Sequence, residues 1–381
     1  MKIAVVCDSF KGSLTSKDAC AAVKDGLLRC NKNFEVLSLP FADGGEGTSR
    51  CFYDILGGQL RKAAVHDPLL REITAEYTVL PDGTAVIDVA SASGLTLLKS
   101  SERDAVKVSS LGSGELICDA AEHGAKHIIL GLGGSATTDA GTGILYALGM
   151  RFFSEDGVEV LPDGQNMIRV KKIRRTENFE RFKDIKFTLA CDVTNPLCGE
   201  NGAAYVFSPQ KGASKNDVEL LDDGLRNIGE IFEKASGKKI INLPGAGAAG
   251  GIGGGLSAFL NCELQSGFDV LERAASLEDK IRRSDAVITG EGKTDRQTLF
   301  GKLPKRVSDI AEKFGVPCIL LSGDVENDIS TETLGVCEIH KIKENGISLE
   351  HCMKNAASLL SERAFAIGKD SKIINKQYSR K

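Results

Sequence analysis

The sequence predicts an α/β fold with two α/β domains: a discontinuous flavodoxin-like or Rossmann-like domain and a second α/β domain inserted into it. Three observations support this prediction. A strand followed by a helix is indicated near the N-terminus, the same order returns near the C-terminus, and the region between them contains a β-hairpin pattern. The length of 381 residues also favours two domains, because one hydrophobic core rarely serves so many residues.

The first predicted strand–helix unit lies at the N-terminus. Residues 2–7 are nearly all apolar, which fits a strand that is covered on both faces. Asp8 ends that strand, and a helix opens at Thr15 or Ser16, where Thr15 and Asp18 have the spacing of a capping box. The loop between strand and helix lies at the carboxyl end of the strand, where open α/β sheets bind ligands.

The C-terminal part of the chain repeats this alternation of buried strands, polar loops and helices, as a doubly wound sheet requires. The predicted elements are a strand at 286–289, a loop at 290–301, a helix at 304–314, strands at 318–322 and 336–342, and a closing helix at 349–367.

The middle of the chain has a different pattern. Residues 72–80 alternate between polar and apolar, a Pro-Asp-Gly turn signal follows, and residues 85–89 alternate again, which predicts a β-hairpin. Further strand–helix units are expected at 127–132 and 187–191. The predicted domains are a doubly wound domain at 1–65 and 285–381 and an inserted α/β domain at 66–284.

Composition excludes several classes of protein. The net charge is -4 and the basic residues form no stripe, so nucleic acid is not an expected partner. The N-terminus becomes acidic too soon for a signal peptide, and no apolar run approaches the roughly 18 residues of a membrane span. We therefore expect a cytoplasmic protein without membrane contact, and the sequence leaves a homo-oligomer open.

Glycine is the unusual component: 42 residues, or about 11% of the chain, against a typical 7%. Two glycine-rich segments, 131–139 and 245–255, lead into apolar helix patterns. Small residues before a helix let backbone N–H groups point at an anion, and the helix dipole favours negative charge there. A tight strand–helix turn in the first segment and a flexible loop in the second are the alternative interpretations.

Phosphoryl transfer also needs carboxylates for magnesium and for the acceptor hydroxyl, and a cation for developing charge. Polar loops supply both kinds of group. Asp192 follows a predicted buried strand, Asp295 lies in a loop of mixed charge, Asp8 and Lys11 follow the first strand, and Asp43 and Glu46 lie on a glycine-rich turn. Each carboxylate could also cap a turn without taking part in chemistry.

A dehydrogenase is the competing interpretation from the residues alone. Gly131, Gly133 and Ala136 follow a predicted strand with the spacing of a dinucleotide fingerprint, and Glu155 lies about 20 residues further on, where a ribose-binding acid would stand. Residues 245–250 fit the same pattern. Both segments would bind NAD(P) in a hydroxy-acid dehydrogenase, so glycine spacing alone does not separate the two activities.

Successive polar blocks carry a resemblance to a known family. They are Asp8 to Lys11, Ala42 to Thr48, Gly133 to Thr137, Ala190 to Leu197, Pro209 to Ala213, Pro244 to Gly251 and Gly290 to Lys302. Their order and spacing are similar to those of the bacterial-type glycerate kinases. The resemblance implies two α/β domains, one inserted in the other, and phosphorylation of (R)-glycerate by ATP with Mg²⁺, usually giving 2-phosphoglycerate. The chain departs from the family pattern at Cys7, Thr138 and Ala140, where proline, asparagine and glycine are common.

Residue roles within this resemblance are hypotheses. We expect nucleotide phosphates to bind at Gly133, Gly134, Ser135, Thr137, Gly247 and Gly250, and the substrate to bind at Asp8, Ser9, Asp43, Glu46 and Lys293. Asp192, Asp295 and Lys11 are the expected catalytic residues, and Asp192 and Asp295 are also the expected Mg²⁺ ligands. Lys11 would stabilise transferring charge or bind the substrate carboxylate. A non-catalytic nucleotide sensor would carry the same binding loops and stays a third hypothesis.

Overall fold

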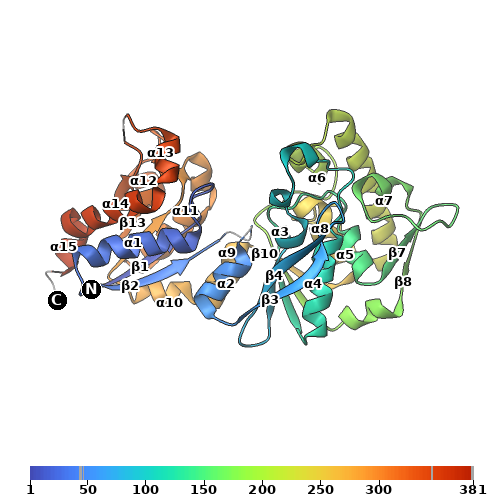
Figure 1. Cartoon of the computed structure of the whole chain (residues 1–381), viewed down its shortest axis with the longest axis horizontal. Helices are drawn as coiled ribbons and strands as arrows, with labels where there is room; N and C mark the ends of the chain where they lie inside the picture. Colours follow the sequence, from blue (N-terminus) through green and yellow to red (C-terminus); the bar gives the residue numbers. More distant parts are fainter. Residues whose placement is uncertain (43–44, 46, 345, 379–381) are drawn as a thin grey trace. The chain divides into compact units, whose positions relative to one another are not determined.

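The computed structural model describes residues 1–42, 45, 47–344 and 346–378, and it confirms the predicted α/β fold class. The chain divides into two compact units (Figure 1), which we treat separately. Unit 1 comprises Met1–Asp43 and Phe268–Lys381, and unit 2 comprises Gly44–Gly267. Among the described residues, no helix combines the length and the apolar character needed to cross a membrane.

Unit 1 is built on a five-stranded sheet in which all strand pairs are parallel. The strand order, β15-β13-β11-β1-β2, is the flavodoxin-like order 2-1-3-4-5 when the strands are counted within the unit. Its elements are β1 (Lys2–Cys7), α1 (Ser16–Cys30), β2 (Glu35–Pro40), α9 (Gly267–Ala275), α10 (Leu277–Arg282), β11 (Ala286–Gly290), β12 (Lys293–Thr294), η6 (Arg296–Phe300), α11 (Leu303–Lys313), β13 (Cys318–Ser322), β14 (Asp324–Val325), α12 (Thr331–Leu334), β15 (Glu338–Lys341), α13 (Leu349–Lys354), α14 (Ala356–Asp370) and α15 (Lys372–Tyr378).

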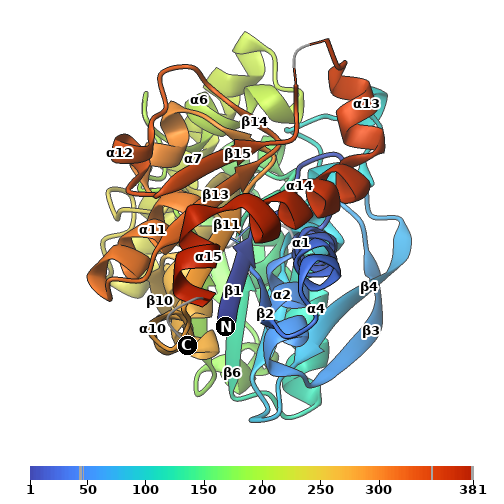
Figure 2. The same cartoon turned by 90° about the vertical axis from the view of Figure 1, so that its left-hand side faces the viewer.

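The N-terminal strand and helix form as predicted. The side chain of Thr15 caps α1 by accepting a hydrogen bond from the backbone N–H of Asp18, at 3.1 Å. The buried face of α1 packs against α14 (Figure 2), and Gly26 lets the two backbones approach, because a Cβ there would collide with the carbonyl oxygen of Ser361. The predicted closing helix is in fact two helices, α13 and α14, with a break at Asn355, whose φ and ψ of -111° and 18° are not helical.

Unit 2 contains a six-stranded mixed sheet in the order β10-β9-β6-β5-β4-β3, and the first four strands of that order run parallel. The predicted β-hairpin is present as the antiparallel pair of β4 and β5. The elements are α2 (Thr48–Leu56), β3 (Gln59–His66), β4 (Glu72–Val79), β5 (Ala85–Asp88), α3 (Ala90–Ser93), η1 (Leu95–Leu97), η2 (Ser100–Glu102), α4 (Leu111–Glu122), β6 (His127–Gly131), α5 (Thr142–Ala147), β7 (Met150–Phe153), η3 (Gly164–Arg169), β8 (Lys172–Arg175), η4 (Glu177–Phe182), β9 (Lys186–Ala190), α6 (Ala203–Phe207), η5 (Pro209–Lys211), α7 (Lys215–Ser236), α8 (Ala248–Phe259) and β10 (Asn261–Gln265).

The units divide at other positions than the predicted boundaries near 65 and 284. Helix α2 and strand β3 belong to unit 2, because β3 pairs with β4 from Gln59 to His66. In addition, Asp88 at the end of β5 accepts hydrogen bonds from the backbone N–H groups of Gly47 and Ser49, both at 3.0 Å, and so holds the start of α2. Helices α9 and α10 likewise lie with unit 1.

Candidate active site

The carboxyl ends of the unit 1 strands open into a pocket of about 650 Å³. Loops after β1, β11, β13 and β15 line it, as expected for ligand sites of open α/β sheets. Four predicted residues, Asp8, Ser9, Lys11 and Lys293, line this pocket together with the predicted Asp295. The structure therefore brings together residues that are distant in the sequence and were predicted either to bind the substrate or to act in catalysis.

The pocket has a polar side and an apolar side. Lysines and carboxylates come from the strand ends, while Phe10, Ile342, Leu349 and Met353 contribute apolar surface. Gly292 and Gly323 let the loops after β11 and β13 meet, because a Cβ on Gly323 would collide with the carbonyl oxygen of Gly292. A pocket of this size with one apolar wall can bind a molecule considerably larger than a three-carbon acid.

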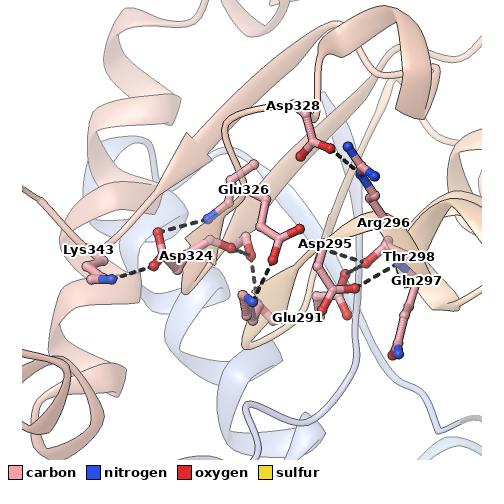
Figure 3. A network of polar contacts seen from close by, with 12 residues as sticks. Glu291, Asp295, Arg296, Gln297, Thr298, Asp324, Glu326, Asp328 and Lys343 are labelled. Atoms are coloured by element: carbon pink, nitrogen blue, oxygen red, sulfur yellow. Dashed lines mark hydrogen bonds and ion pairs between the residues drawn. The ribbon is translucent and has the colours of Figure 1, made fainter.

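Glu291 is a buried carboxylate in this pocket that the predicted site residues did not include. Its Oε1 accepts a hydrogen bond of 2.7 Å from the hydroxyl of Thr298 (Figure 3), and burial raises the pKa of its carboxyl group. The position directly after β11 was the signal available in the sequence. The burial of Glu291 and its bond to Thr298 of η6 depend on the folded chain, so the sequence alone could not predict them.

Asp295 has a structural task in the same network. Its Oδ1 accepts the backbone N–H of Gln297 at 2.9 Å and lies 3.5 Å from Lys302 Nζ, so the carboxylate caps η6 (Figure 3). Lys293 is exposed and pairs with Glu326 at 2.8 Å, which raises the pKa of the lysine. Both residues keep polar atoms at the pocket, but neither is free of partners.

In unit 2, the predicted phosphate loop follows β6 at the carboxyl edge of the parallel strands. Gly134 has a left-handed backbone with φ of 77°, which glycine adopts without strain. Within the described residues, the backbone N–H groups of Gly133, Gly134 and Thr137 donate to no acceptor of the chain. The hydroxyl of Thr137 is buried and also has no partner there. Unsatisfied polar groups at a strand–helix turn fit an anionic ligand.

Asp139 fixes the end of this loop. It is fully buried, and Oδ2 accepts hydrogen bonds from the N–H and the hydroxyl of Ser110 at 2.8 and 2.7 Å. The backbone N–H of Gly141 donates to its Oδ1 at 3.1 Å. Burial raises the pKa of the Asp139 carboxyl, although these hydrogen bonds oppose the shift. The carboxylate oxygens of Asp139 accept hydrogen bonds that hold the loop in place, so Asp139 has a structural role.

The second glycine-rich segment packs on the first. The backbone N–H of Ala140 donates to the carbonyl of Gly250 at 3.0 Å, and that of Gly247 donates to Asn195 at 3.0 Å. A Cβ on Gly250 would lie 2.6 Å from Thr138 Cα. The structure thus accounts for Gly247 and Gly250 through close backbone packing, and their contact with phosphate stays a prediction.

The other predicted residues lie outside the unit 1 pocket or outside the described residues. Asp192 is exposed after β9, the strand beside β6, so it lies at the same sheet edge as the phosphate loop. Asp43 and Glu46 lie outside the described residues. Lys211, from the predicted block at 209–213, was missed: it is buried and donates to Ser135 and Thr137.

Sequence comparison decides which known proteins share these loops. The sequence model of the Glycerate kinase family matches residues 3–372. The chain belongs to the glycerate kinase family. It is 38% identical over 364 residues to a glycerate kinase of Halalkalibacterium halodurans, covering 95% of this chain and 96% of the relative. It is 41% identical over 330 residues to the glycerate 2-kinase of Escherichia coli K12, covering 86% and 87% of the two chains.

A solved structure from Salmonella typhimurium LT2, assigned to glycerate kinase 2, has the same fold. It superposes with a TM-score of 0.87 at 34% identity and covers 99% of each chain. Membership of the glycerate kinase family makes the chain a phosphotransferase that acts on glycerate. The family assignment therefore favours the kinase interpretation over the dehydrogenase interpretation of the glycine-rich loops.

Proposed function

We propose that the chain transfers the terminal phosphoryl group of ATP to the 2-hydroxyl of (R)-glycerate, giving 2-phosphoglycerate and ADP. The observation that carries the proposal is the loop after β6, where the N–H groups of Gly133, Gly134 and Thr137 have no acceptor among the described residues. A kinase needs such donors, since phosphoryl transfer depends on positioning and on charge stabilisation. The name of the Escherichia coli relative, glycerate 2-kinase, supports the 2-position.

The residues of each unit have separate proposed tasks. The loop with Gly133, Gly134, Ser135 and Thr137 binds nucleotide phosphates. In unit 1, the ammonium group of Lys11 binds the glycerate carboxylate or the transferring charge. The other proposed substrate residues are Asp8, Ser9, Lys293, Asp43 and Glu46. Lysine suits this task because its ammonium group is a compact charge on a flexible stem.

In the proposed step, the glycerate hydroxyl oxygen forms a bond to the terminal phosphorus as the bond from phosphorus to the leaving ADP oxygen breaks. The hydroxyl proton passes to a carboxylate, for which Asp192 and Asp295 are the proposed candidates. Glu291 is a third candidate, since it lines the unit 1 pocket and burial raises the pKa of its carboxyl group.

The proposed Mg²⁺ ligands are Asp192 and Asp295, whose carboxylate oxygens are the hard donors that this ion prefers. Throughout the described ranges, no three His, Cys, Asp or Glu side chains gather as a metal-binding group. Mg²⁺ usually takes one or two carboxylates together with phosphates and water rather than a protein cage. When bound, the ion would neutralise charge on the phosphate oxygens.

The decisive experiment incubates the protein with ATP, Mg²⁺ and a panel of hydroxy acids and follows ³¹P and ¹H NMR spectra. We expect ADP to form only with (R)-glycerate, and the proton coupling of the product phosphorus to identify 2-phosphoglycerate. ADP formation that is the same with and without glycerate would contradict the proposal. ATP binding without turnover would support a sensor, and oxidation of the acid by NAD(P) would support a dehydrogenase.

Substitution of the carboxylates tests their roles. We expect at least one of Asp192→Asn and Asp295→Asn to lower kcat by more than about 10²-fold, the usual contribution of a positioned acid or base. Asp328→Asn is the matched control, since Asp328 forms an exposed ion pair with Arg296 in the same network (Figure 3). Such pairs contribute little, so its kcat should change by less than about threefold. Small losses in both test variants would remove these carboxylates from the mechanism.

The apolar wall of the unit 1 pocket favours a second assignment for this pocket, the nucleoside part of ATP instead of glycerate. Met353 and Leu349 offer surface that glycerate, a small polar acid, does not use, whereas the nucleoside part of ATP would. A Met353→Glu variant separates the two assignments. A KM for ATP raised about tenfold, with an unchanged KM for glycerate, would place the nucleoside in this pocket; the reverse result would keep the pocket for the acid.

A further inference from the structure

Lys211 is a buried cation at the phosphate loop that the proposed mechanism leaves without a task. Its side chain is 3% exposed and comes from η5. Nζ donates hydrogen bonds to the hydroxyl of Ser135 at 3.0 Å and to the carbonyl oxygen of Thr137 at 2.6 Å. Both acceptors are neutral, so these two bonds orient the ammonium group without balancing its charge.

No carboxylate of the described chain forms an ion pair with Lys211. Asp139 is the titratable group among the described residues that acts on it, and the Asp139 carboxylate raises the pKa of the lysine. Burial has the larger effect and lowers the pKa of Lys211 to about 7. A buried charge is normally paired, because an isolated one loses its hydration without compensation. An anion bound beside Lys211 would supply the partner that its ammonium form lacks among the described residues.

A second observation points to the same ligand. The hydroxyl of Thr137 is completely buried and makes no hydrogen bond within the described structure. The neighbouring N–H groups of Gly133 and Gly134 also lack acceptors there. A buried hydroxyl and two backbone donors on one short loop, with the buried amine of Lys211 bonded to that loop from η5, form a set that suits an acceptor-rich ligand.

We propose that Lys211 is the counter-charge of an oxyanion site at residues 133–137 and that it takes up a proton when the anion binds. The inference rests on the proposed function, which supplies two oxyanions: the nucleotide phosphates and the glycerate carboxylate. Lys211 acts through Ser135 and Thr137 and is thus a positioning residue. In the protein without ligand, the amine of Lys211 is largely neutral, so the loop contains no unpaired buried charge. Binding of the anion then favours the ammonium form of Lys211.

Isothermal titration calorimetry tests the coupling directly, with no turnover. Wild-type protein is titrated at pH 8.0 with MgADP, and separately with (R)-glycerate, in two phosphate-free buffers of different ionisation enthalpy. Nucleotide phosphates are fully ionised at this pH, since their second pKa is about 6. Because the pKa of Lys211 lies below this pH in the empty protein, we expect uptake of up to about one proton per MgADP bound. Uptake with glycerate alone would support the same site but assign it to the substrate carboxylate.

Two variants supply the controls. Lys211→Arg keeps a permanent charge, so nucleotide binds without proton uptake. Lys211→Met removes the charge at similar volume, and affinity for MgADP falls at least about tenfold, also without uptake. Thermal melting followed by circular dichroism establishes that each variant is folded. A variant that fails to fold leaves the wild-type measurement decisive.

Binding of both ligands by the wild type without proton uptake would overturn the inference, and so would unchanged MgADP affinity in folded Lys211→Met. A purely structural lysine would hold the loop but produce no buffer-dependent heat. Failure of the proposed function is a separate result: proton uptake without glycerate-dependent ADP formation would retain the anion site and remove the kinase reaction.

Discussion

Gly250→Ala should destabilise the protein by altering the contact between the two glycine-rich loops. Gly250 has φ of 70°, a left-handed conformation, and a Cβ at this position would lie 2.6 Å from Thr138 Cα and 2.8 Å from the carbonyl carbon of Thr137. Both neighbours are backbone atoms, so no side-chain rotation relieves the collision. The loop that contains Thr137 and Thr138 must itself move.

The expected magnitude has two parts. A left-handed alanine costs about 1–2 kcal/mol relative to glycine. Inserting a methyl group into a packed interior adds about 1–3 kcal/mol, because the surroundings must shift. The free energy of unfolding should therefore fall by about 2–5 kcal/mol in Gly250→Ala. Gly237→Ala isolates the first part, since Gly237 has φ of 74° and no atom within 4 Å of its Cβ position.

Urea denaturation followed by far-UV circular dichroism is the suitable assay, because the chain contains no tryptophan. We expect Gly250→Ala to be about 1–3 kcal/mol less stable than Gly237→Ala, the contribution of the collision alone. The KM for ATP should rise in Gly250→Ala and stay unchanged in the control. Equal stability of the two variants would refute the packing argument, since the left-handed backbone would then account for the whole loss.

Two further predictions concern buried ionisable groups. Because the folded-state pKa of Lys211 is about 7 and the unfolded value is near 10.4, the unfolded state binds more protons between these values, and stability rises with pH. From pH 7 to 8, urea unfolding should show a gain of about 1 kcal/mol in wild type relative to Lys211→Met; parallel pH profiles would contradict the buried neutral amine. Glu291→Gln should lower kcat at least about tenfold if Glu291 accepts the hydroxyl proton, whereas Glu326→Gln, which breaks only the exposed pair with Lys293, should change kcat less than about threefold. Equal kcat values for these two variants would exclude Glu291 as the base.

Local patterns predicted much of the fold because local physics forms those elements. Strand β1 is apolar and buried from Ile3 to Cys7, and the Thr15–Asp18 capping pair starts α1 where the sequence indicated. The β4–β5 hairpin followed from alternation around a turn. Strand β3 was missed because its residues, Gln59–His66, mix charged and small side chains, and only their pairing with β4 makes them a strand.

The candidate site was predicted in part, for a similar reason. Polar residues directly after strands identified the pocket lining of unit 1. Lys211 and Glu291 were missed because burial, not residue type, distinguishes them. Lys211 meets Thr137 across 74 residues of sequence, and no local pattern reports that contact. The family resemblance came from ordered motif blocks, whereas individual roles depend on partners that only the fold brings together.

The position of β1 has a consequence for synthesis of the chain. It lies between β2 and β11 in the unit 1 sheet, whereas unit 2 is continuous from Gly44 to Gly267. A growing chain can therefore complete unit 2 before β11 has been synthesised. Until then, one edge of the apolar β1 has no strand partner. Unpaired apolar edges promote association between chains. Ribosome-bound chains that end shortly after Gly267 should therefore contain a protease-resistant unit 2 and a protease-sensitive N-terminus that gains protection only after β11 has been synthesised.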